Sequence, residues 1–300
     1  MSRGADMALP DALAMKPDAA PRPAPARRAF RRPPTEVVVG AAILATVALL
    51  AVLAPLFTSI NPEALALDQR LQAPSLAHPF GTDDLGRDLF SRVLYGGRVS
   101  LGVGVAAALL SGTLGAAVGV ISPISRLVDT ILMRILDGVM SIPAILLAIA
   151  LVAVAGPSVQ NVIIAVTVVE VPRIARIIRS EVLSLRERAY VDAAITAGSS
   201  TARIIFRHLL PGVFSQLIVQ ATFVWAAAMM IEAGLSFIGA GIPPTTPSWG
   251  NIMADGRSLW QIRPNLIFIP AAFLSATLIG VNILGDGLRK ALNPRAGSRR

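Results

Sequence analysis

Long charge-free apolar blocks alternate with short charged segments along most of the chain. A helix of about 20 apolar residues crosses the hydrocarbon core of a bilayer, which is about 30 Å thick. The longest block, 138–169, is too long for one span, and the Gly-Pro-Ser sequence at 156–158 divides it in two. This pattern predicts an all-α integral membrane protein with six transmembrane helices. The predicted spans cover residues 37–57, 99–121, 137–155, 159–178, 209–231 and 264–285.

The distribution of arginine and lysine predicts how these spans are oriented. Most of these residues lie in the two tails, 1–36 and 289–300, and in the loops around 122–138 and 172–208. Cytoplasmic loops carry an excess of basic residues. Six spans place all four segments on one side, so we expect both termini in the cytoplasm. The tail 1–36 is rich in Pro, Ala and Arg, lacks apolar periodicity, and is expected to be disordered.

The polar segment 58–98 is then expected on the outer, periplasmic side. Near its end, apolar residues at helical spacing and an acid–base pair four residues apart predict a short amphipathic helix on the outer surface. The helix would lead into the span 99–121, with Thr82 or Asp83 as its N-cap. The residues that carry this pattern are Leu85, Asp88, Leu89, Arg92 and Val93.

Composition limits the chemistry that this chain can carry. Hydrophobic residues make up 54% and charged residues 15%, there is no cysteine, and the two histidines, His78 and His208, lie far apart. Neither lysine, Lys16 or Lys290, stands in the G-x-x-x-x-G-K-[ST] pattern of a nucleotide-binding P-loop. We therefore expect no catalytic site and no metal or cofactor bound by this chain. The net charge of +9 comes from residues that flank apolar blocks, which favours cytoplasmic loops over nucleic-acid binding.

Charged residues close to the predicted spans are candidates for the transport pathway or its gate, because such charges are costly in a membrane. Glu170 lies one helical turn before Arg173 and is expected to pair with it, and Glu232 lies at the outer end of the span 209–231. Arginine also recurs at 176 and 179, the spacing of a voltage sensor. Arginines that extend to the cytoplasmic interface explain this short series better.

Glycines in the span 99–121 permit two interpretations. Small residues let neighbouring helices approach closely, and they also line wide pathways. Close packing is the more common role, and we favour it. The glycines are Gly102, Gly104, Gly112, Gly115 and Gly119.

The cytoplasmic loop contains a helix predicted over 190–203. Ala194, Ala197 and Gly198 are spaced i, i+3 and i+4, so one face of this helix would carry almost no side-chain bulk. Asp192, near its start, suits the helix dipole. A bare face fits the docking of another protein, and it fits equally a helix packed on its own bundle.

The same loop resembles the EAA loop of type I ABC-importer permeases. That family's pattern is E-A-A-x3-G-x9-I-x-L-P, and here Asp192 begins it, Gly198 follows and Pro211 ends it. Asp replaces Glu, and His208 replaces Ile, as is common in the dipeptide/oligopeptide/nickel branch. Other stretches resemble the C-type permease subunit of that branch. They are 78–98, 133–143, 232–237, 247–257 and 282–289. One departure is Glu170-Val171-Pro172, where many members carry Trp-Pro.

The resemblance implies a five-helix transmembrane core at 99–288 and a coupling helix that docks into cytoplasmic ATPases. The residues implied in this coupling are Asp192, Ala193, Ala194, Ala197, Gly198, Arg203 and Pro211. It also implies a bacterial inner-membrane location, a second homologous permease that completes a heterodimer, two ABC ATPase subunits and an extracytoplasmic substrate-binding protein. ATP would be used only by the partner subunits.

The function expected from the resemblance is ATP-driven import of di- or oligopeptides. Nickel or another small solute is the alternative within the class. A secondary transporter that works without an ATPase is the alternative outside it, and it would require an ionisable relay or inverted repeats with broken helices.

Overall fold

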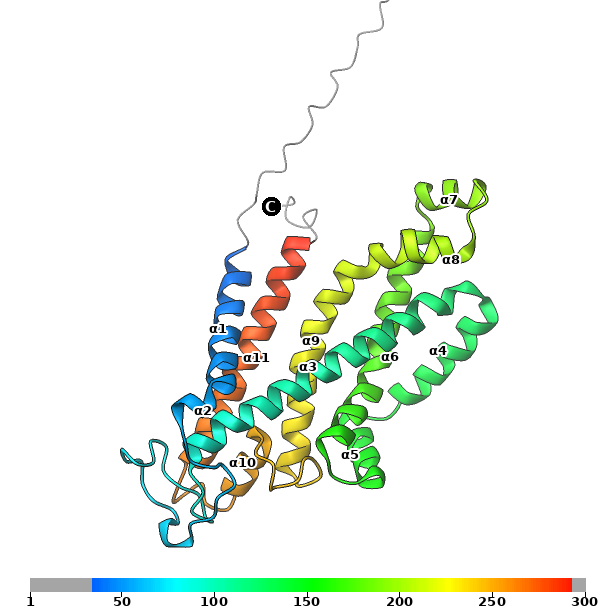
Figure 1. Cartoon of the computed structure of the whole chain (residues 1–300). Helices are drawn as coiled ribbons and strands as arrows, with labels where there is room; N and C mark the ends of the chain where they lie inside the picture. The colour runs from blue at the N-terminus through cyan, green and yellow to red at the C-terminus, as the bar shows by residue number, and fades with distance from the viewer. Residues whose placement is uncertain (1–33, 293–300) are drawn as a thin grey trace, which may run out of the picture. The chain divides into compact units, whose positions relative to one another are not determined.

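A computed structural model describes residues 34–292. All regular elements in this range are helices, and the α-helices form one elongated bundle (Figure 1). The predicted tail 1–36 lies outside the described residues up to position 33, and so do residues 293–300 of the predicted C-terminal tail. The α-helices are α1 (Thr35–Val52), α2 (Ala54–Phe57), α3 (Leu89–Ile121), α4 (Arg126–Met140), α5 (Ala144–Ala155), α6 (Val159–Arg186), α7 (Ala189–Thr196), α8 (Thr201–Ile204), α9 (Leu210–Phe237), α10 (Trp249–Gly256) and α11 (Asn265–Leu292). Short 3-10 turns lie at Leu67–Gln69 and Ser122–Ile124, and a π-helical turn lies at Ile205–Leu209.

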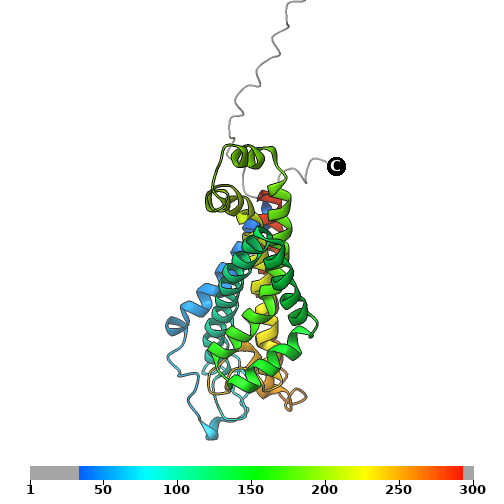
Figure 2. The ribbon, with the colours of Figure 1, turned by 90° about the vertical axis from the view of Figure 1, so that its right-hand side faces the viewer.

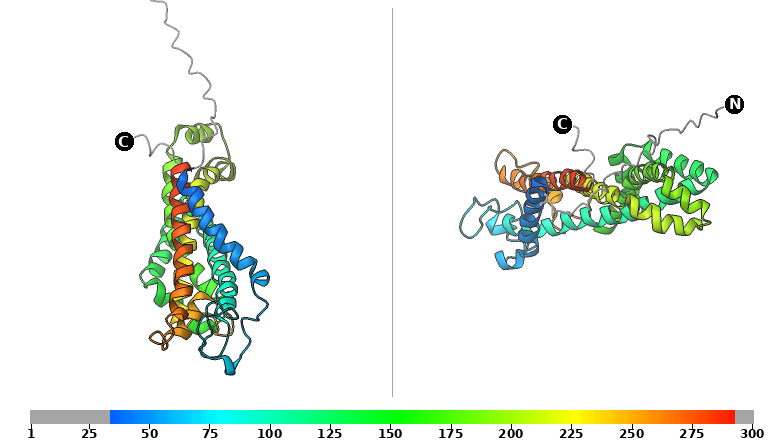
Figure 3. Two further views of the ribbon diagram at one scale, coloured as in Figure 1. Left: turned by 90° about the vertical axis from the view of Figure 1, so that its left-hand side faces the viewer. Right: turned by 90° about the horizontal axis from the view of Figure 1, so that it is seen from above.

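The bundle has two clearly different ends. The start of α1, the end of α11, and the helices α7 and α8 lie at one end, while α2, α10 and the loop 58–88 lie at the other (Figures 1 and 2). Seen from above, α1 and α11 lie at one side of the bundle and α4 and α7 at the opposite side (Figure 3). Both described chain ends are therefore on the same side as the predicted cytoplasmic loop.

Four described helices are long and apolar enough to cross a membrane: α1, α3, α9 with the turns before it, and α11. The bent pair α4–α5 makes a fifth if it counts as one span. The sixth predicted span, 159–178, lies within α6, which is less apolar because Glu170, Arg173 and Arg176 fall inside it. The all-α membrane architecture is confirmed, and the count of six spans stays a prediction.

Two predicted spans are interrupted near prolines, so their boundaries are corrected here. The span 137–155 is not one helix, because the chain bends by 89° between α4 and α5 at Ser141–Pro143. The span 37–57 breaks at Leu53, where Pro55 lacks the N–H that would bond the carbonyl of Ala51. Arg98 repairs this second break, since its guanidinium donates to the carbonyl oxygens of Ala51 and Val52, each at 2.7 Å.

Helices α3 and α6 form the most extensive helix pair, and glycine makes it possible. A methyl group added at Gly119 would lie 2.6 Å from the carbonyl oxygen of Ala175, and one at Gly115 would lie 2.7 Å from the Cβ of Ile174. A methyl group added at Gly104 would likewise collide with the indole ring of Trp225 of α9. No atom lies within 4 Å of the corresponding position at Gly102. Close packing therefore explains three of the five glycines that the sequence left open.

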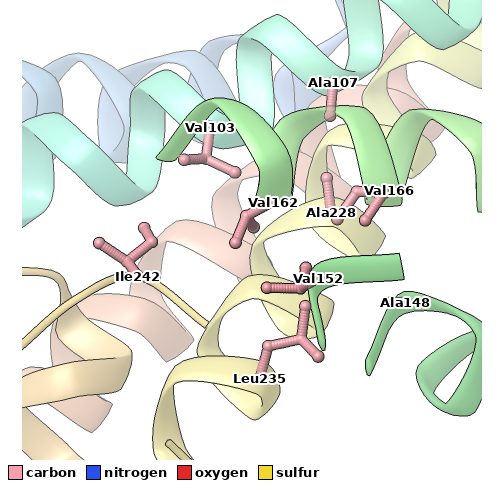
Figure 4. Packing of buried hydrophobic residues seen from close by; sticks show 10 residues of the cluster. Val103, Ala107, Ala148, Val152, Val162, Val166, Ala228, Leu235 and Ile242 are labelled. Carbon is pink, nitrogen blue, oxygen red and sulfur yellow. The ribbon is translucent and has the colours of Figure 1, made fainter. Parts of the chain in front are cut away.

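The core between α3, α5, α6 and α9 is built from small and branched side chains. Figure 4 shows valines and alanines of these four helices pointing toward one another, joined by Leu235 and Ile242. Small side chains keep the helix axes close, as is usual for helices that pack in membranes. Small side chains therefore extend to α5 and α9 the close packing that glycine permits between α3 and α6.

The predicted amphipathic helix near residue 90 does not lie on the surface. Leu89 and Val93 are fully buried and form the first turns of α3 itself. The N-cap is Asp88, which accepts from the N–H of Ser91 at 2.7 Å, and not Thr82 or Asp83. Asp88 also contacts Nδ1 of His78 at 2.9 Å and does not pair with Arg92.

Two arginines and two aspartates instead form a buried cluster at this end of the bundle. Asp83 accepts from Nε of Arg87 at 2.6 Å and from Nη1 of Arg92 at 2.5 Å. Asp255 of α10 accepts from the same two arginines at 2.8 and 2.9 Å. The cluster therefore ties the start of α3 to α10, which lies more than 160 positions away in the sequence.

Replacing Gly119 by Ala should destabilise the protein by about 1–3 kcal/mol, because the added methyl group meets backbone that cannot give way. The matched change Gly102→Ala, in the same helix but with open space, should leave stability unchanged or slightly raised. Thermal unfolding of the purified protein in detergent measures both. Equal midpoints for the two variants would contradict the packing role of Gly119.

Replacing Asp83 by Asn should lower the free energy of unfolding by about 3–5 kcal/mol, because it leaves two buried guanidinium groups short of a charge partner. Asp84 provides the control, since it is the next residue, half-buried, and has no side-chain hydrogen bond among the described residues. Asp84→Asn should change stability by no more than about 0.5 kcal/mol. The comparison uses the same thermal unfolding measurement, and an unshifted Asp83→Asn midpoint would show that the cluster contributes little.

Candidate functional site

The loop that carries the coupling motif forms two short helices, and not the single helix predicted over 190–203. Helix α7 ends at Thr196, and Gly198 adopts a left-handed conformation with φ of 77°. The N–H of Gly198 donates to the carbonyl of Ile195, and that of Ser199 donates to the carbonyl of Ala194. This pair of bonds is the Schellman motif, which ends helices at glycine. Gly198 is therefore the terminator of α7 and does not lie inside a helix.

The structure brings most of the predicted coupling residues together around this turn. Asp192, Ala193, Ala197 and Gly198 are exposed on α7 and its C-terminal turn, and Ala194 is half-buried. Asp192 lies in the first turn of α7, as its effect on the helix dipole requires. The two remaining residues lie apart from this group: Arg203 is exposed on α8, and Pro211 is in the first turn of α9.

The opposite face of α7 is held by its own bundle. Val191 is fully buried, and beneath it a cavity of about 270 Å³ separates α7 and α8 from α6 and the end of α3. The ring of Tyr190 lies 6.0 Å from that of His208, which joins α7 to the π-helical turn before α9. The sequence left open whether this helix packs on its own bundle or docks with another protein. In the structure, one face of α7 packs on the bundle and the opposite face is exposed.

The arginines at 173, 176 and 179 of α6 all face a carboxylate. Arg179 makes two bonds to Asp129 of α4, at 2.6 and 2.5 Å, and Arg176 pairs with Asp137 of the same helix. Arg173 lies 3.5 Å from Glu170. The series is thus not a free voltage sensor, because two of its members clamp α6 to α4. The side chains of Arg173 and Arg176 are also 53% and 44% exposed.

Glu170 lies deep in the bundle, beside the bend between α4 and α5. Its side chain is 3% exposed, and the distance to Arg173 agrees with the predicted i,i+3 pair. Yet Oε2 is fully enclosed and makes no hydrogen bond. A small cavity of about 190 Å³ opens at this carboxylate, lined by Val139, Met140, Ile142, Pro143, Ala144, Leu147, Val169 and Arg173.

Glu232 is completely buried, and it joins three parts of the structure. Its carboxylate accepts from Ser236 Oγ at 2.9 Å and from Ser100 Oγ of α3 at 3.1 Å. The two hydroxyl groups accept in turn from the N–H groups of Ile242 and Trp249. Because backbone donors occupy both hydroxyl oxygens, the hydroxyl protons point to the carboxylate. Glu232 therefore holds α10 and the loop before it against α3 and α9.

Among residues 34–292, no group of three or more His, Asp or Glu side chains lies close enough together to hold a metal ion. The geometry defines a helical membrane protein with a small, exposed turn at one end and a helix pair, α4 and α5, bent by 89° along one side of the bundle.

Comparison with known proteins gives the family. Residues 104–298 match the family described as binding-protein-dependent transport system inner membrane component. A peptide transport system permease of Brucella suis is 46% identical over 292 residues, covering 97% of this chain and 98% of that protein. The dipeptide transport system permease DppC of Alkalihalophilus pseudofirmus is 43% identical over 265 residues, covering 87% and 86%. The oligopeptide transport system permease OppC of Bacillus subtilis is 38% identical over 259 residues, covering 86% and 85%.

The fold agrees with this assignment. Inward-facing structures of the MetNI methionine ABC transporter align with a TM-score of 0.57 over 67% of this chain and 96% of the matched chain, at 19% identity. The chain belongs to the binding-protein-dependent inner-membrane permeases, the transmembrane subunits of ABC importers. It is a transport subunit and not an enzyme, and members of this family work with separate ATPase and substrate-binding proteins. The family assignment excludes the ATPase-independent transporter as an alternative.

Proposed function

We propose that this chain is the C-type permease of a di- or oligopeptide importer and forms half of the translocation pathway in a heterodimer with a second homologous permease. The names of the relatives support the peptide substrate, since permeases for peptides, dipeptides and oligopeptides match along most of their length. Nickel or another small solute is the alternative, and nothing in the geometry favours it.

The exposed turn after α7 is the observation that carries the proposed coupling. The turn itself presents only small side chains, Ala197, Gly198 and Ser199, and it follows a helix whose inner face is anchored by Val191; the larger Tyr190 and Ile195 of α7 are partly exposed beside it. The turn suits a groove in another protein, because its small side chains permit close approach of a backbone. Two cytoplasmic ATPase subunits, one for each permease, would dock there and pass the movement of ATP-driven closure to α7 and α6.

The same proposal assigns the two ends of the bundle. The end with α7 and both described chain ends faces the cytoplasm, where the tails and basic loops belong. The opposite end, with the buried ion cluster and α10, faces the periplasm and the substrate-binding protein. Of the two buried glutamates, Glu170 borders the pathway, while Glu232 positions α10.

Cross-linking tests the docking surface directly, because the chain contains no cysteine. A cysteine at the exposed Ala197, paired with one in the groove of the ATPase, should form a disulfide in membranes whose yield changes with ATP. A cysteine at Val191 is the control, since that side chain is fully buried and should not react. Absence of any cross-link from Ala193, Ala197 and Gly198 would overturn the coupling role.

Replacing Gly198 by Trp should abolish transport and leave the protein inserted in the membrane. No atom of this chain lies within 4 Å of the added Cβ, so a loss caused by bulk must arise from contact with another protein. Gly198→Ala is the matched control, because both variants carry the strain of a left-handed backbone, about 1–2 kcal/mol, and only Trp adds bulk. Uptake in whole cells, with immunoblots of membranes, distinguishes them. Equal uptake by the two variants would contradict docking at this turn.

A further inference from the structure

The cavity at Glu170 has features that the coupling role of the chain does not use. It lies where α4 ends and α5 begins, about 16 Å along α6 from the residue at which that helix starts. This depth is close to the middle of a bilayer core, where broken helices form binding sites in other transporters. The break is therefore a suitable place for a solute to be held in passage.

The cavity combines an apolar lining with one fixed negative charge. Its lining is apolar except for Glu170 and Arg173. The carboxylate is 97% buried, whereas the Arg173 side chain is 53% exposed, so the acid is fixed and the base is free to move. The carbonyl end of α4 adds negative partial charge beside the same cavity. Such a site selects for a positive group on the solute.

The unused capacity of Oε2 supports a ligand at this position. A buried carboxylate oxygen without a hydrogen bond is costly, and native structures rarely keep one without a reason. Arg173 lies near it at 3.5 Å and still does not donate a hydrogen bond to it. An ammonium group in the cavity would provide the short, charge-assisted hydrogen bond that Arg173 does not.

We propose that Glu170 binds the protonated amino group of the solute in the cavity between α4, α5 and α6, taking the place of Arg173 while the solute passes. This inference rests on the proposed import of peptides, whose free amino terminus is the group in question. The cavity of about 190 Å³ is large enough for an amino terminus and a small first side chain, and not for a long peptide. Glu170 would thus make the pathway itself selective, in addition to any selection by the binding protein.

The test compares dialanine with N-acetyl-dialanine, which lacks the ammonium group. Initial uptake rates of both are measured in proteoliposomes that contain the complete transporter and its binding protein. The ratio of the two rates is then compared between variants, because the preference of the binding protein is common to all and cancels. Glu170→Gln, which keeps shape and removes charge, should lower this ratio at least about tenfold.

Two further variants separate binding from a structural role. Glu181→Gln changes another glutamate of α6, eleven positions further along the same helix, and should leave the ratio unchanged. Arg173→Gln removes the competing cation and should raise the ratio. If Glu170 served only as the partner of Arg173, Glu170→Gln and Arg173→Gln would shift the ratio in the same direction, and the inference would be overturned.

The two proposals fail in different ways. Wild-type uptake of dialanine with an unchanged ratio in Glu170→Gln would overturn the role of Glu170 and leave peptide import standing. A wild-type transporter that takes up neither peptide would overturn peptide import, and with it the ligand assigned here. ATPase activity stimulated by the binding protein, measured on the same samples, confirms that each variant is assembled.

Discussion

The close approach of α3 and α6 at Gly115 and Gly119 is the constraint on which the rest of the bundle depends. Helices inside a membrane gain little from the hydrophobic effect, so their association depends on packing at short distance. At Gly119 the backbone of α3 meets the carbonyl of Ala175, and at Gly115 the side chain of Ile174 fills the space that the glycine leaves. Because α6 is fixed here, everything attached to it takes a defined position: the clamp to α4, the cavity at Glu170 and the turn after α7.

Breaks in the helices are the second determinant of the architecture, and each needs a local repair. Backbone polar groups cannot be left unpaired in hydrocarbon. At Pro55 the guanidinium of Arg98 supplies the missing donors, from a helix whose contact with α1 could not be inferred from the local sequence. At Pro143 the chain bends instead, and the bend creates the cavity. The carbonyl groups left unpaired near Pro55 thus regain donors from Arg98, whereas the bend at Pro143 leaves a cavity beside Glu170.

The sequence predicted the membrane class and most helices because charge-free apolar blocks of about 20 residues are typical of helices that cross a bilayer. It failed where local pattern and tertiary contact compete. Gly198 fits a helical face by spacing, and only the backbone shows that it ends α7. Arg92 was assigned to a surface helix, with Asp83 as a possible N-cap, because apolar residues at helical spacing and an acid–base pair are typical of an amphipathic helix. Asp255, the partner of Arg87 and Arg92, is distant in sequence, and no local signal predicts that pairing.

Coupling and selectivity meet in one helix if both proposals hold. Helix α6 leads into α7, and Arg176 and Arg179 join it to α4. A displacement of α7 would therefore move α4 and α6 together, while α5, beyond the bend, is held by the apolar core against α3, α6 and α9. The cavity at Glu170 lies at the border between these parts. A force applied to the exposed turn would change the shape of the cavity, so that closure of the ATPases and release of a bound ammonium group become steps of one movement.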